Sequence, residues 1–293
     1  MAGAGLIAIK RRIKSINNTK KITKAIGLVA TSKLRKNRGS LALNNDYYNS
    51  FREIMNEVLV DNEIDTNNIY FKSNGSKKKL YITLTSDTGL CGGFNANVVS
   101  KTLEYLLKDK ENSLLIIVGQ KGRTYFKKFN IESVAEYVEV PDMPTIKEAK
   151  TILDKALTLY SKGEVGEVNV IYTEFISAVK QEVKLKKLLP IERESIGVSN
   201  ENNKDDKNSI VEFEPEKEKI LETISELYLK QTLLNLMLNS KTSEQSARMN
   251  AMDGATKNAN DLLDKLNLQY NRIRQSTITQ EISEIVGGAE AQR

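Results

Sequence analysis

The feature that most constrains the fold of this chain is the lack of helix-breaking residues in its C-terminal segment. No proline follows Pro215, and only Gly254 interrupts the sequence before Gly287. Residues 216–293 can therefore form one continuous helix, roughly 110 Å long at about 1.5 Å per residue. A helix of that length far exceeds an ordinary globular helix and predicts a coiled coil or a similar helix pair.

Apolar residues near both ends of the chain recur with the spacing of a coiled coil. Near the N-terminus they step by three and four positions at Leu6, Ile9, Ile13 and Ile16, and the same seam is expected to resume at Ile22, Ile26 and Val29. Near the C-terminus they step in the same way at Leu263, Leu266, Tyr270 and Ile273, followed by Ile278, Ile282 and Ile285. This spacing predicts that two long terminal helices pair as an antiparallel coiled coil.

Small residues support close pairing of these helices. Alanine recurs every four residues, at Ala247, Ala251, Ala255 and Ala259, and a row of small side chains lets two helix backbones approach. The alternative is that the two helices are separate amphipathic helices packed on a globular core. The length of the C-terminal segment favours the coiled coil.

The middle of the chain has a different pattern. The β-rich runs 80–85, 114–118 and 168–176 alternate with the helix-like stretches 96–110, 121–129 and 145–162, which predicts a small α/β domain with a parallel sheet. Residues 181–191 are a candidate for a further strand, and residues 197–209 are expected to form a polar surface loop. The predicted fold class is α/β, with an antiparallel coiled coil and a central Rossmann-like domain. The expected segments are an N-terminal helix (1–60), this domain (78–195) and a long C-terminal helix (210–293).

The charge of the N-terminal segment predicts an anionic partner. Residues 1–45 contain seven Lys, four Arg and no acidic residue, which is typical of binding to nucleic acid, a membrane surface or an acidic protein face. Nucleic acid has no stacking platform here, because the chain has no Trp and no aromatic residue precedes Tyr47. The basic residues also interleave with the apolar seam, so a solvated outer face of a coiled coil is the other alternative. An acidic protein is the favoured partner.

Several absences argue against catalysis. The chain has no His, the commonest general base, and its carboxylates form no recognisable acid–base pair. The single cysteine, Cys91, excludes an intramolecular disulfide and a cysteine zinc cluster, and it favours a reducing compartment. No apolar run approaches the length of a membrane span, and residues 1–9 are too short for a signal-peptide core. A cleaved transit peptide is disfavoured by the helical order of this segment.

The stretch SDTGLCGGFN, residues 86–95, lies between an expected strand and an expected helix, where many proteins bind a phosphate. Its glycines do not have the G-x-G-x-x-G spacing of a dinucleotide site, and no lysine follows Gly93 as a P-loop requires. We therefore favour a structural reading, in which the glycines allow a tight turn and close helix-to-strand packing. A nucleotide-dependent α/β enzyme stays the rival hypothesis.

The C-terminal end of the last predicted helix also differs from an ordinary exposed helix. It is smooth and largely apolar, with Ile282, Ile285, Val286, Gly287, Gly288 and Ala289 close together. We expect it to be enclosed by another protein.

Stretches in both terminal segments and in the middle resemble the γ subunit of F-type ATP synthases. They are IKRRIKSI (9–16) with NTKKITKA (18–25), then SDTGLCGGFN, then SEQSARMNAM (243–252), and finally YNRIRQSTITQE (270–281) followed by EIVGGA (284–289). The resemblance covers the whole chain in order. It implies a non-catalytic rotor without a cofactor, whose paired terminal helices form a shaft inside a ring of three α and three β subunits. The α/β domain would contact the ε subunit and the membrane c-ring, on the cytoplasmic side of a cell membrane.

The resemblance also implies roles for individual residues. Arg274 and Gln275 match a pair that hydrogen-bonds a β-subunit loop, and Thr279 and Glu281 lie in the same stretch. Ile26 would face the lever region of the β subunits. The residues expected to face acidic β-subunit levers are Lys10, Arg11, Lys33, Arg35 and Lys36. The expected shaft tip consists of Ile282, Ile285, Val286, Gly287 and Gly288. A nucleic-acid-binding helical hairpin is the second rival hypothesis.

Overall fold

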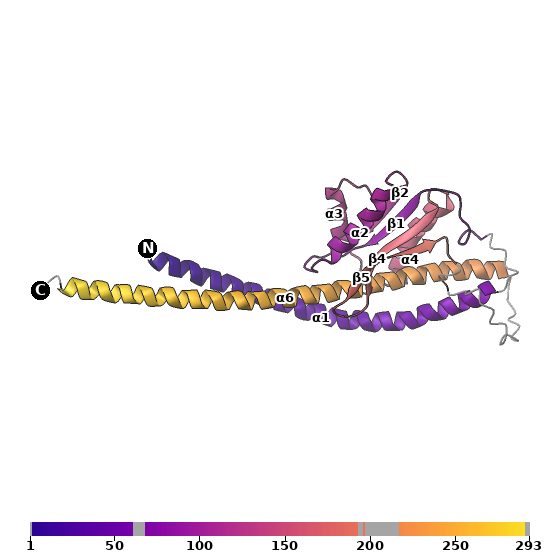
Figure 1. Cartoon of the computed structure of the whole chain (residues 1–293). Coiled ribbons are helices and arrows are strands. Elements are labelled where there is room, and N and C mark those ends of the chain that lie inside the picture. The colour runs from indigo at the N-terminus through magenta and orange to yellow at the C-terminus, as the bar shows by residue number, and fades with distance from the viewer. Residues whose placement is uncertain (1, 61–67, 193–195, 197–216, 291–293) are drawn as a thin grey trace. The chain divides into compact units, whose positions relative to one another are not determined.

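The structure, a computed structural model, describes residues 2–60, 68–192, 196 and 217–290. The chain begins with helix α1 (Ala2–Val60) and ends with helix α6 (Lys217–Glu290), as Figure 1 shows. Between them lie β1 (Lys79–Leu84), α2 (Phe94–Lys108), β2 (Ser113–Val118), α3 (Gln120–Lys128), β3 (Ala135–Tyr137), α4 (Ile146–Ser161), β4 (Glu167–Phe175) and β5 (Gln181–Leu189). The predicted fold class, paired terminal helices with a central α/β domain, is confirmed.

The chain divides into two compact units. We call Met1–Thr31 together with Arg248–Arg293 the terminal unit, and Ser32–Ala247 the central unit. Helices α1 and α6 each contribute to both units. The predicted continuous C-terminal helix is confirmed: α6 passes through Gly254 without interruption.

In the terminal unit, α1 packs on α6 along a narrow seam. The residues of α1 that are buried or half-buried there step by three and four positions throughout: Leu6, Ile9, Ile13, Ile16, Lys20, Thr23, Gly27 and Ala30. Ile26 is half-buried beside them. This is the heptad spacing of a coiled coil, so the predicted pairing of the two helices is confirmed.

The predicted continuation of the seam through Ile22 and Val29 is wrong. Their side chains are 59% and 55% exposed, because an unbroken heptad after Ile16 selects positions roughly 100° away around the helix. The heptad positions after Ile16 are instead occupied by polar or small residues, namely Lys20, Thr23, Gly27 and Ala30. The Thr23 and Thr256 hydroxyls share a hydrogen bond of 2.8 Å, and a Cβ on Gly27 would lie 3.4 Å from the Met252 Cβ.

The seam of α6 follows the prediction only as far as Ile273. Leu263, Leu266 and Ala259 are buried, and Tyr270, Ile273, Ala251 and Ala255 are half-buried. In the central unit, Ala247 is also half-buried. The expected seam positions Ile278, Ile282 and Ile285 are exposed instead.

The reason is the length of α1. Thr23 lies beside Thr256 and Gly27 beside Met252, which fixes the antiparallel register. Extending this register places the first turn of α1 opposite Thr277, the last half-buried residue of α6. The described residues of α6 beyond Thr277 therefore have no α1 residue to pack against.

The central unit contains a five-stranded sheet in the order β3-β2-β1-β4-β5. Strand β1 pairs in parallel with β2 and β4, and β2 pairs in parallel with β3. The expected parallel sheet is therefore correct for four strands. The candidate strand within residues 181–191 is confirmed as β5, but it pairs antiparallel to β4 as a hairpin, which makes the sheet mixed. The three-residue strand β3 escaped the sequence analysis because it is so short.

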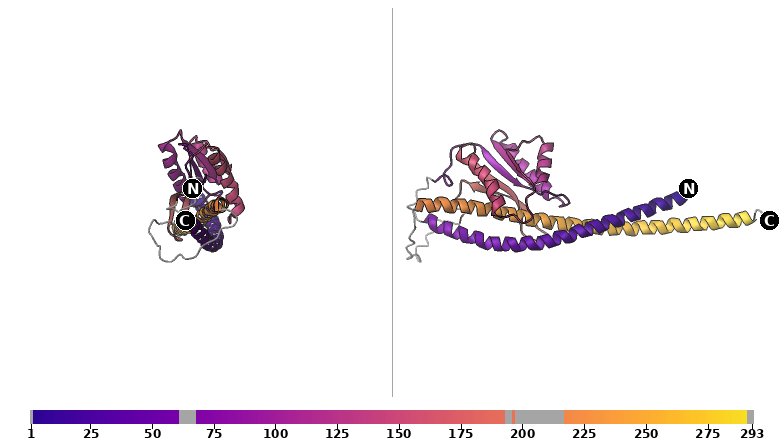
Figure 2. Two further views of the ribbon diagram at one scale, coloured as in Figure 1. Left: turned by 90° about the vertical axis from the view of Figure 1, so that its right-hand side faces the viewer. Right: turned by 180° about the vertical axis from the view of Figure 1, so that it is seen from behind.

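Alternating side chains of the sheet enter two separate cores. On one face, Tyr81, Leu115 and Ile117 pack with residues of α2 and α3. On the other face, Leu80, Ile82 and others pack with α4 and with the parts of α1 and α6 that belong to the central unit. Figure 2 shows α2 and α4 on opposite faces of the sheet.

The position of the α6 seam can be tested with two leucines of the same helix. Leu266→Ala is expected to lower the free energy of unfolding by about 2 kcal/mol, because the deleted side chain leaves a cavity in the seam. Leu266 is 6% exposed, whereas Leu268 is 68% exposed, so the control Leu268→Ala should cost less than about 0.5 kcal/mol. Urea unfolding followed by circular dichroism measures both. Equal losses would contradict the seam.

Candidate functional site

The terminal unit presents the expected partner-binding residues of α6 to the outside. Arg274, Gln275, Thr279 and Glu281 are all exposed. The Thr279 hydroxyl donates to the Gln275 carbonyl within the helix at 3.0 Å. Because α1 packs on the face of α6 that holds Ile273, the Arg274 and Gln275 side chains are free to meet another molecule.

The end of α6 forms a single helix with an unpaired apolar stripe. Ile278, Ile282, Ile285 and Val286 follow one another at steps of four, three and one, and all four are exposed. This spacing places them on one face of the helix. Gly287 and Gly288 are exposed as well, and a Cβ at either position would meet nothing within 4 Å. An apolar helix face without a partner is typical of a segment that another protein encloses.

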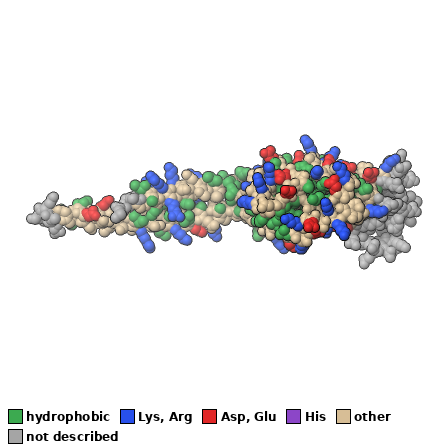
Figure 3. All heavy atoms as spheres, turned by 90° about the horizontal axis from the view of Figure 1, so that it is seen from above, with side chains coloured by type: hydrophobic (Ala, Val, Ile, Leu, Met, Phe, Trp, Pro, Cys, Tyr) green, Lys and Arg blue, Asp and Glu red, His purple; other side chains and the backbone are tan. Residues whose placement is uncertain are grey.

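The basic residues expected to face a partner are not equivalent. Lys10 and Arg11 are exposed on α1 in the terminal unit, and Figure 3 shows Lys and Arg side chains projecting along the helix pair. In the central unit, Arg35 and Lys36 are exposed. Lys33 is half-buried, and its ammonium lies 2.7 Å from an Asp142 carboxylate oxygen.

The stretch SDTGLCGGFN leaves the carboxyl end of β1, between β2 and β4. The connections that leave β1 and its neighbour β4 run in opposite directions along the strand order, and such a switch point is where open α/β sheets usually bind ligands. In this protein the polar groups of the loop turn inward instead. The Asn95 amide accepts from the Ser86 backbone N–H at 3.0 Å, and it donates to the Ser86 hydroxyl at 2.7 Å and to the Cys91 sulfur at 3.2 Å.

The glycines of this stretch allow the turn conformation, and they are not sites of close helix-to-strand packing. Gly92 has a φ of 57°, in the left-handed region that favours glycine. Cβ atoms on Gly89 and Gly93 would meet only side chains, at 3.5 Å or more. The close approach occurs at Gly119, where a Cβ would lie 2.4 Å from the Thr85 carbonyl oxygen. The expected tight turn is confirmed, and the expected close packing lies at a different glycine.

Residues 240–246 of helix α6 anchor this helix to the sheet. The sequence analysis assigned no structural role to this segment. The Ser240 hydroxyl accepts from the Thr173 backbone N–H at 3.1 Å, and the Ser243 hydroxyl donates to the Thr173 carbonyl at 3.2 Å. One turn later, the Ser246 hydroxyl donates to the Ala178 carbonyl at 2.8 Å. Serines three residues apart on one helix face were the sequence signal for this contact.

A buried charged cluster lies on another face of the same segment. The Lys241 ammonium donates to the Val140 carbonyl at 3.1 Å and lies 3.7 Å from Asp87 and 3.6 Å from Glu244. Lys241 and Glu244 are both buried. Charged residues are seldom buried without partners. The sequence signal for this cluster was a Lys and a Glu three residues apart, in the part of α6 that packs on the sheet.

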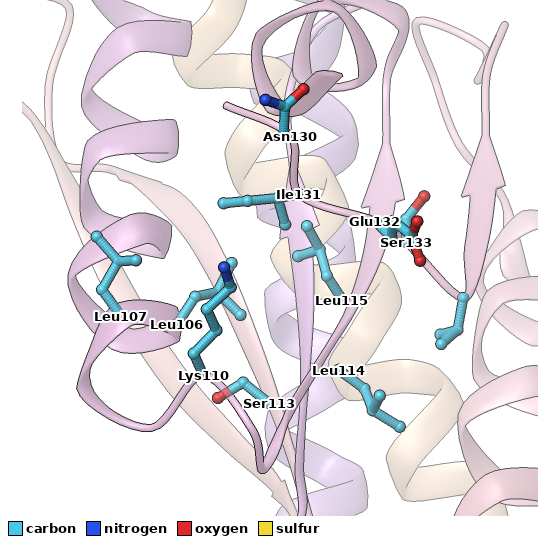
Figure 4. Close-up of a pocket in the computed structure, with 11 residues that line it drawn as sticks. Leu106, Leu107, Lys110, Ser113, Leu114, Leu115, Asn130, Ile131, Glu132 and Ser133 are labelled. Atoms are coloured by element: carbon cyan, nitrogen blue, oxygen red, sulfur yellow. The ribbon is translucent and has the colours of Figure 1, made fainter. Parts of the chain in front are cut away.

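An apolar pocket of about 410 Å³ lies at the opposite end of the sheet (Figure 4). The end of α2, the start of β2 and the turn after α3 line it, with Leu106, Leu107, Leu115 and Ile131 among its residues. None of the interface residues expected from the sequence lines it. Among the described helices, none combines the length and the hydropathy needed to cross a bilayer.

Comparisons with known proteins find the same family along nearly the whole chain. The sequence model of the family described as ATP synthase matches residues 5–292. The ATP synthase gamma chain of Clostridium novyi is 69% identical over 292 residues, which is 100% of both chains. The ATP synthase gamma chain of Clostridium kluyveri is 58% identical over 291 residues, or 99% of each chain.

Solved structures with a similar fold include chains from two mitochondrial ATP synthases. A chain in the central stalk and c-ring structure of the Tetrahymena thermophila ATP synthase has a TM-score of 0.62 and 27% identity, covering 80% of this chain and 99% of that one. A chain from the Euglena gracilis ATP synthase has a TM-score of 0.70 at 18% identity, covering 99% of this chain and 95% of that one. The second likeness concerns the fold alone.

The inward-facing loop can be tested through Cys91, which is the only cysteine and is 2% exposed. Asn95→Ala removes the amide that holds Ser86 and Cys91, and we expect a thiol reagent to label Cys91 about tenfold faster, as for a loss of about 1.4 kcal/mol of hydrogen bonding. The control is Asn97→Ala, since Asn97 lies two residues further along α2 and is exposed. Equal labelling rates for the two variants would contradict the network.

Proposed function

The chain belongs to the gamma-chain family of the ATP synthases, and we propose that it is the turning shaft that couples ion flow through a membrane ring to conformational change at neighbouring catalytic sites. As a gamma chain, it is a non-catalytic subunit of the central stalk. The observation that carries the proposal is the unpaired apolar end of α6, where Ile278, Ile282, Ile285 and Val286 face outward on a single helix. A stripe of this kind needs an enclosing partner.

The proposed partners are those of a complete ATP synthase. Three α and three β subunits surround the terminal unit, and the ε subunit and the c-ring contact the central unit. The resemblance to a chain from a central stalk and c-ring structure supports this arrangement. The protein is then held at the cytoplasmic side of the cell membrane through the complex, and we propose no nucleic-acid partner.

The proposed mechanism needs no chemistry from this chain. A helix pair is not round: in the terminal unit, α1 and α6 present different side chains in each direction. Each orientation therefore contacts the surrounding catalytic subunits differently and stabilises a different conformation of each one. The coupling is a difference in contact free energy, and it works in both directions, for ATP synthesis and for ATP hydrolysis.

The exposed residues have distinct proposed roles. Arg274 and Gln275 hydrogen-bond a loop of a β subunit, and Thr279 and Glu281 extend the same contact. Ile26 borders the contact of α1 with the β subunits, and the end of α6 from Ile282 to Gly288 turns within the surrounding ring.

The basic residues Lys10, Arg11, Arg35 and Lys36 face acidic segments of the β subunits, where they contribute attraction that salt weakens. Lys33 belongs to the same predicted group. Because its ammonium already pairs with Asp142, we propose that it contributes less to the partner contact than the four exposed residues.

The role of the α6 contact can be tested in the assembled complex. Arg274→Ala combined with Gln275→Ala is expected to lower ATP hydrolysis about tenfold, which corresponds to losing about 1.4 kcal/mol of charged hydrogen bonding. Both side chains are exposed, so circular dichroism of the isolated chain should not change.

The matched control is Lys265→Ala, another exposed position on α6, which should leave hydrolysis near the wild-type rate. Wild-type turnover and coupling in the double variant would contradict the assigned role of Arg274 and Gln275.

A further inference from the structure

We propose that Lys241 and Asp87 form a joint that prevents α6 from turning about its own axis against the sheet of the central unit. The inference rests on the proposed rotor function, because only a chain that transmits torque needs such a joint. Lys241 and Asp87 take no part in the contacts with surrounding subunits described above. In this role Lys241 is a positioning residue.

Asp87 is a rigid anchor at the carboxyl edge of the sheet. One of its carboxylate oxygens accepts from the Gln120 backbone N–H at 3.0 Å and from the Glu139 backbone N–H at 2.9 Å. Gln120 begins α3 just after β2, and Glu139 follows β3. Asp87 itself follows β1, so one carboxylate connects the ends of three strands. Its second oxygen is left to face α6.

Lys241 connects this anchor to α6. Its ammonium lies 3.7 Å from the second Asp87 oxygen, and it donates to the carbonyl of Val140, which follows β3. The Lys241 side chain is only 10% exposed, and the Glu244 side chain beside it only 4%. Solvent therefore screens these charges little, and loss of the Lys241 ammonium would remove a positive charge from between two carboxylates.

The serine contacts hold the other side of the same helix turns. Asn239, Ser240, Ser243 and Ser246 bind the backbone of β4 and its hairpin. Lys241 and Gln245 contact the loops after β1 and β3, and Glu244 lies beside Lys241. At 3.6 residues per turn, the centres of these two sets lie roughly 160° apart around the helix. Contacts on one side alone would let the helix roll, whereas contacts on nearly opposite sides block rotation.

Asp142 extends the joint to α1. It accepts from the Gln245 amide at 3.3 Å and pairs with Lys33 of α1 at 2.7 Å. The loop after β3 thus contacts both long helices within the central unit. Torque applied to the sheet is passed to the two helices together, so they are not driven to turn separately.

A buried ionic cluster is a poor means of gaining stability, since apolar residues of similar volume often stabilise a protein as well or better. Directional contacts instead fix one geometry. If the cluster acts as a joint, its loss should uncouple hydrolysis from ion transport more than it destabilises the chain. That separation distinguishes a mechanical role from a merely structural one.

The sharpest variant is Asp87→Asn. The asparagine keeps an oxygen for the Gln120 and Glu139 amides and places an NH₂ group where the carboxylate faced Lys241. Two further variants are Lys241→Met, which removes the charge at similar length, and Lys241→Arg, which retains it. Lys150→Met is the matched control, because Lys150 is exposed on α4. Each variant is assembled into the complete complex in membrane vesicles, and ATP hydrolysis and ATP-driven ion transport are measured on the same vesicles.

We expect Asp87→Asn and Lys241→Met to keep hydrolysis within about twofold of wild type and to lower the ratio of transport to hydrolysis about fivefold, at the lower end of ordinary coupling free energies. Lys241→Arg should restore most of the ratio, and Lys150→Met should not change it. The Asp87→Asn/Lys241→Met double variant should lose no more than Lys241→Met alone, because the contact between Lys241 and Asp87 is already absent from that variant.

An unchanged ratio in Asp87→Asn and Lys241→Met would overturn the joint, and so would a parallel fall of hydrolysis and transport. Additive losses in the double variant would overturn the pairing of Lys241 with Asp87. A wild-type complex that hydrolyses ATP without transporting ions would instead overturn the proposed rotor function, and the joint with it.

Discussion

The antiparallel seam between α1 and α6 must hold two long helices together although half of its α1 positions hold no large apolar side chain. In the terminal unit the seam of α1 passes through Lys20, Thr23, Gly27 and Ala30, where small side chains and one threonine pair replace the leucines of an ordinary coiled coil. Close backbone approach substitutes for apolar volume at these positions. Larger apolar residues such as Ile22 and Val29 are thereby turned outward.

The same seam determines where the paired helices end. Because α1 begins opposite Thr277, the last described turns of α6 have an apolar face without an intramolecular partner. In the central unit the opposite condition holds: α6 is bound on two sides by hydrogen bonds and buried charges. One continuous helix thus combines a firmly held part with a free end, as a shaft requires.

Much of this organisation could be predicted from the sequence. The lack of proline and the apolar spacing predicted both long helices, and the alternation of strand and helix patterns predicted the central domain. The seam beyond Ile16 could not be predicted from apolar residues alone, since its positions hold Lys, Thr, Gly and Ala. The cluster of Lys241 and Asp87 was also missed, because a contact between residues so far apart in sequence leaves no local pattern. The residues proposed to bind partners came from the family resemblance.

The most direct test of the account is to observe rotation. Lys150 is exposed on α4, so a probe can be attached at Lys150→Cys in a chain that also carries Cys91→Ser, with the other subunits of the assembled complex fixed to a surface. The account predicts that adding ATP makes the probe turn stepwise in one direction. ATP hydrolysis with a stationary probe would contradict it.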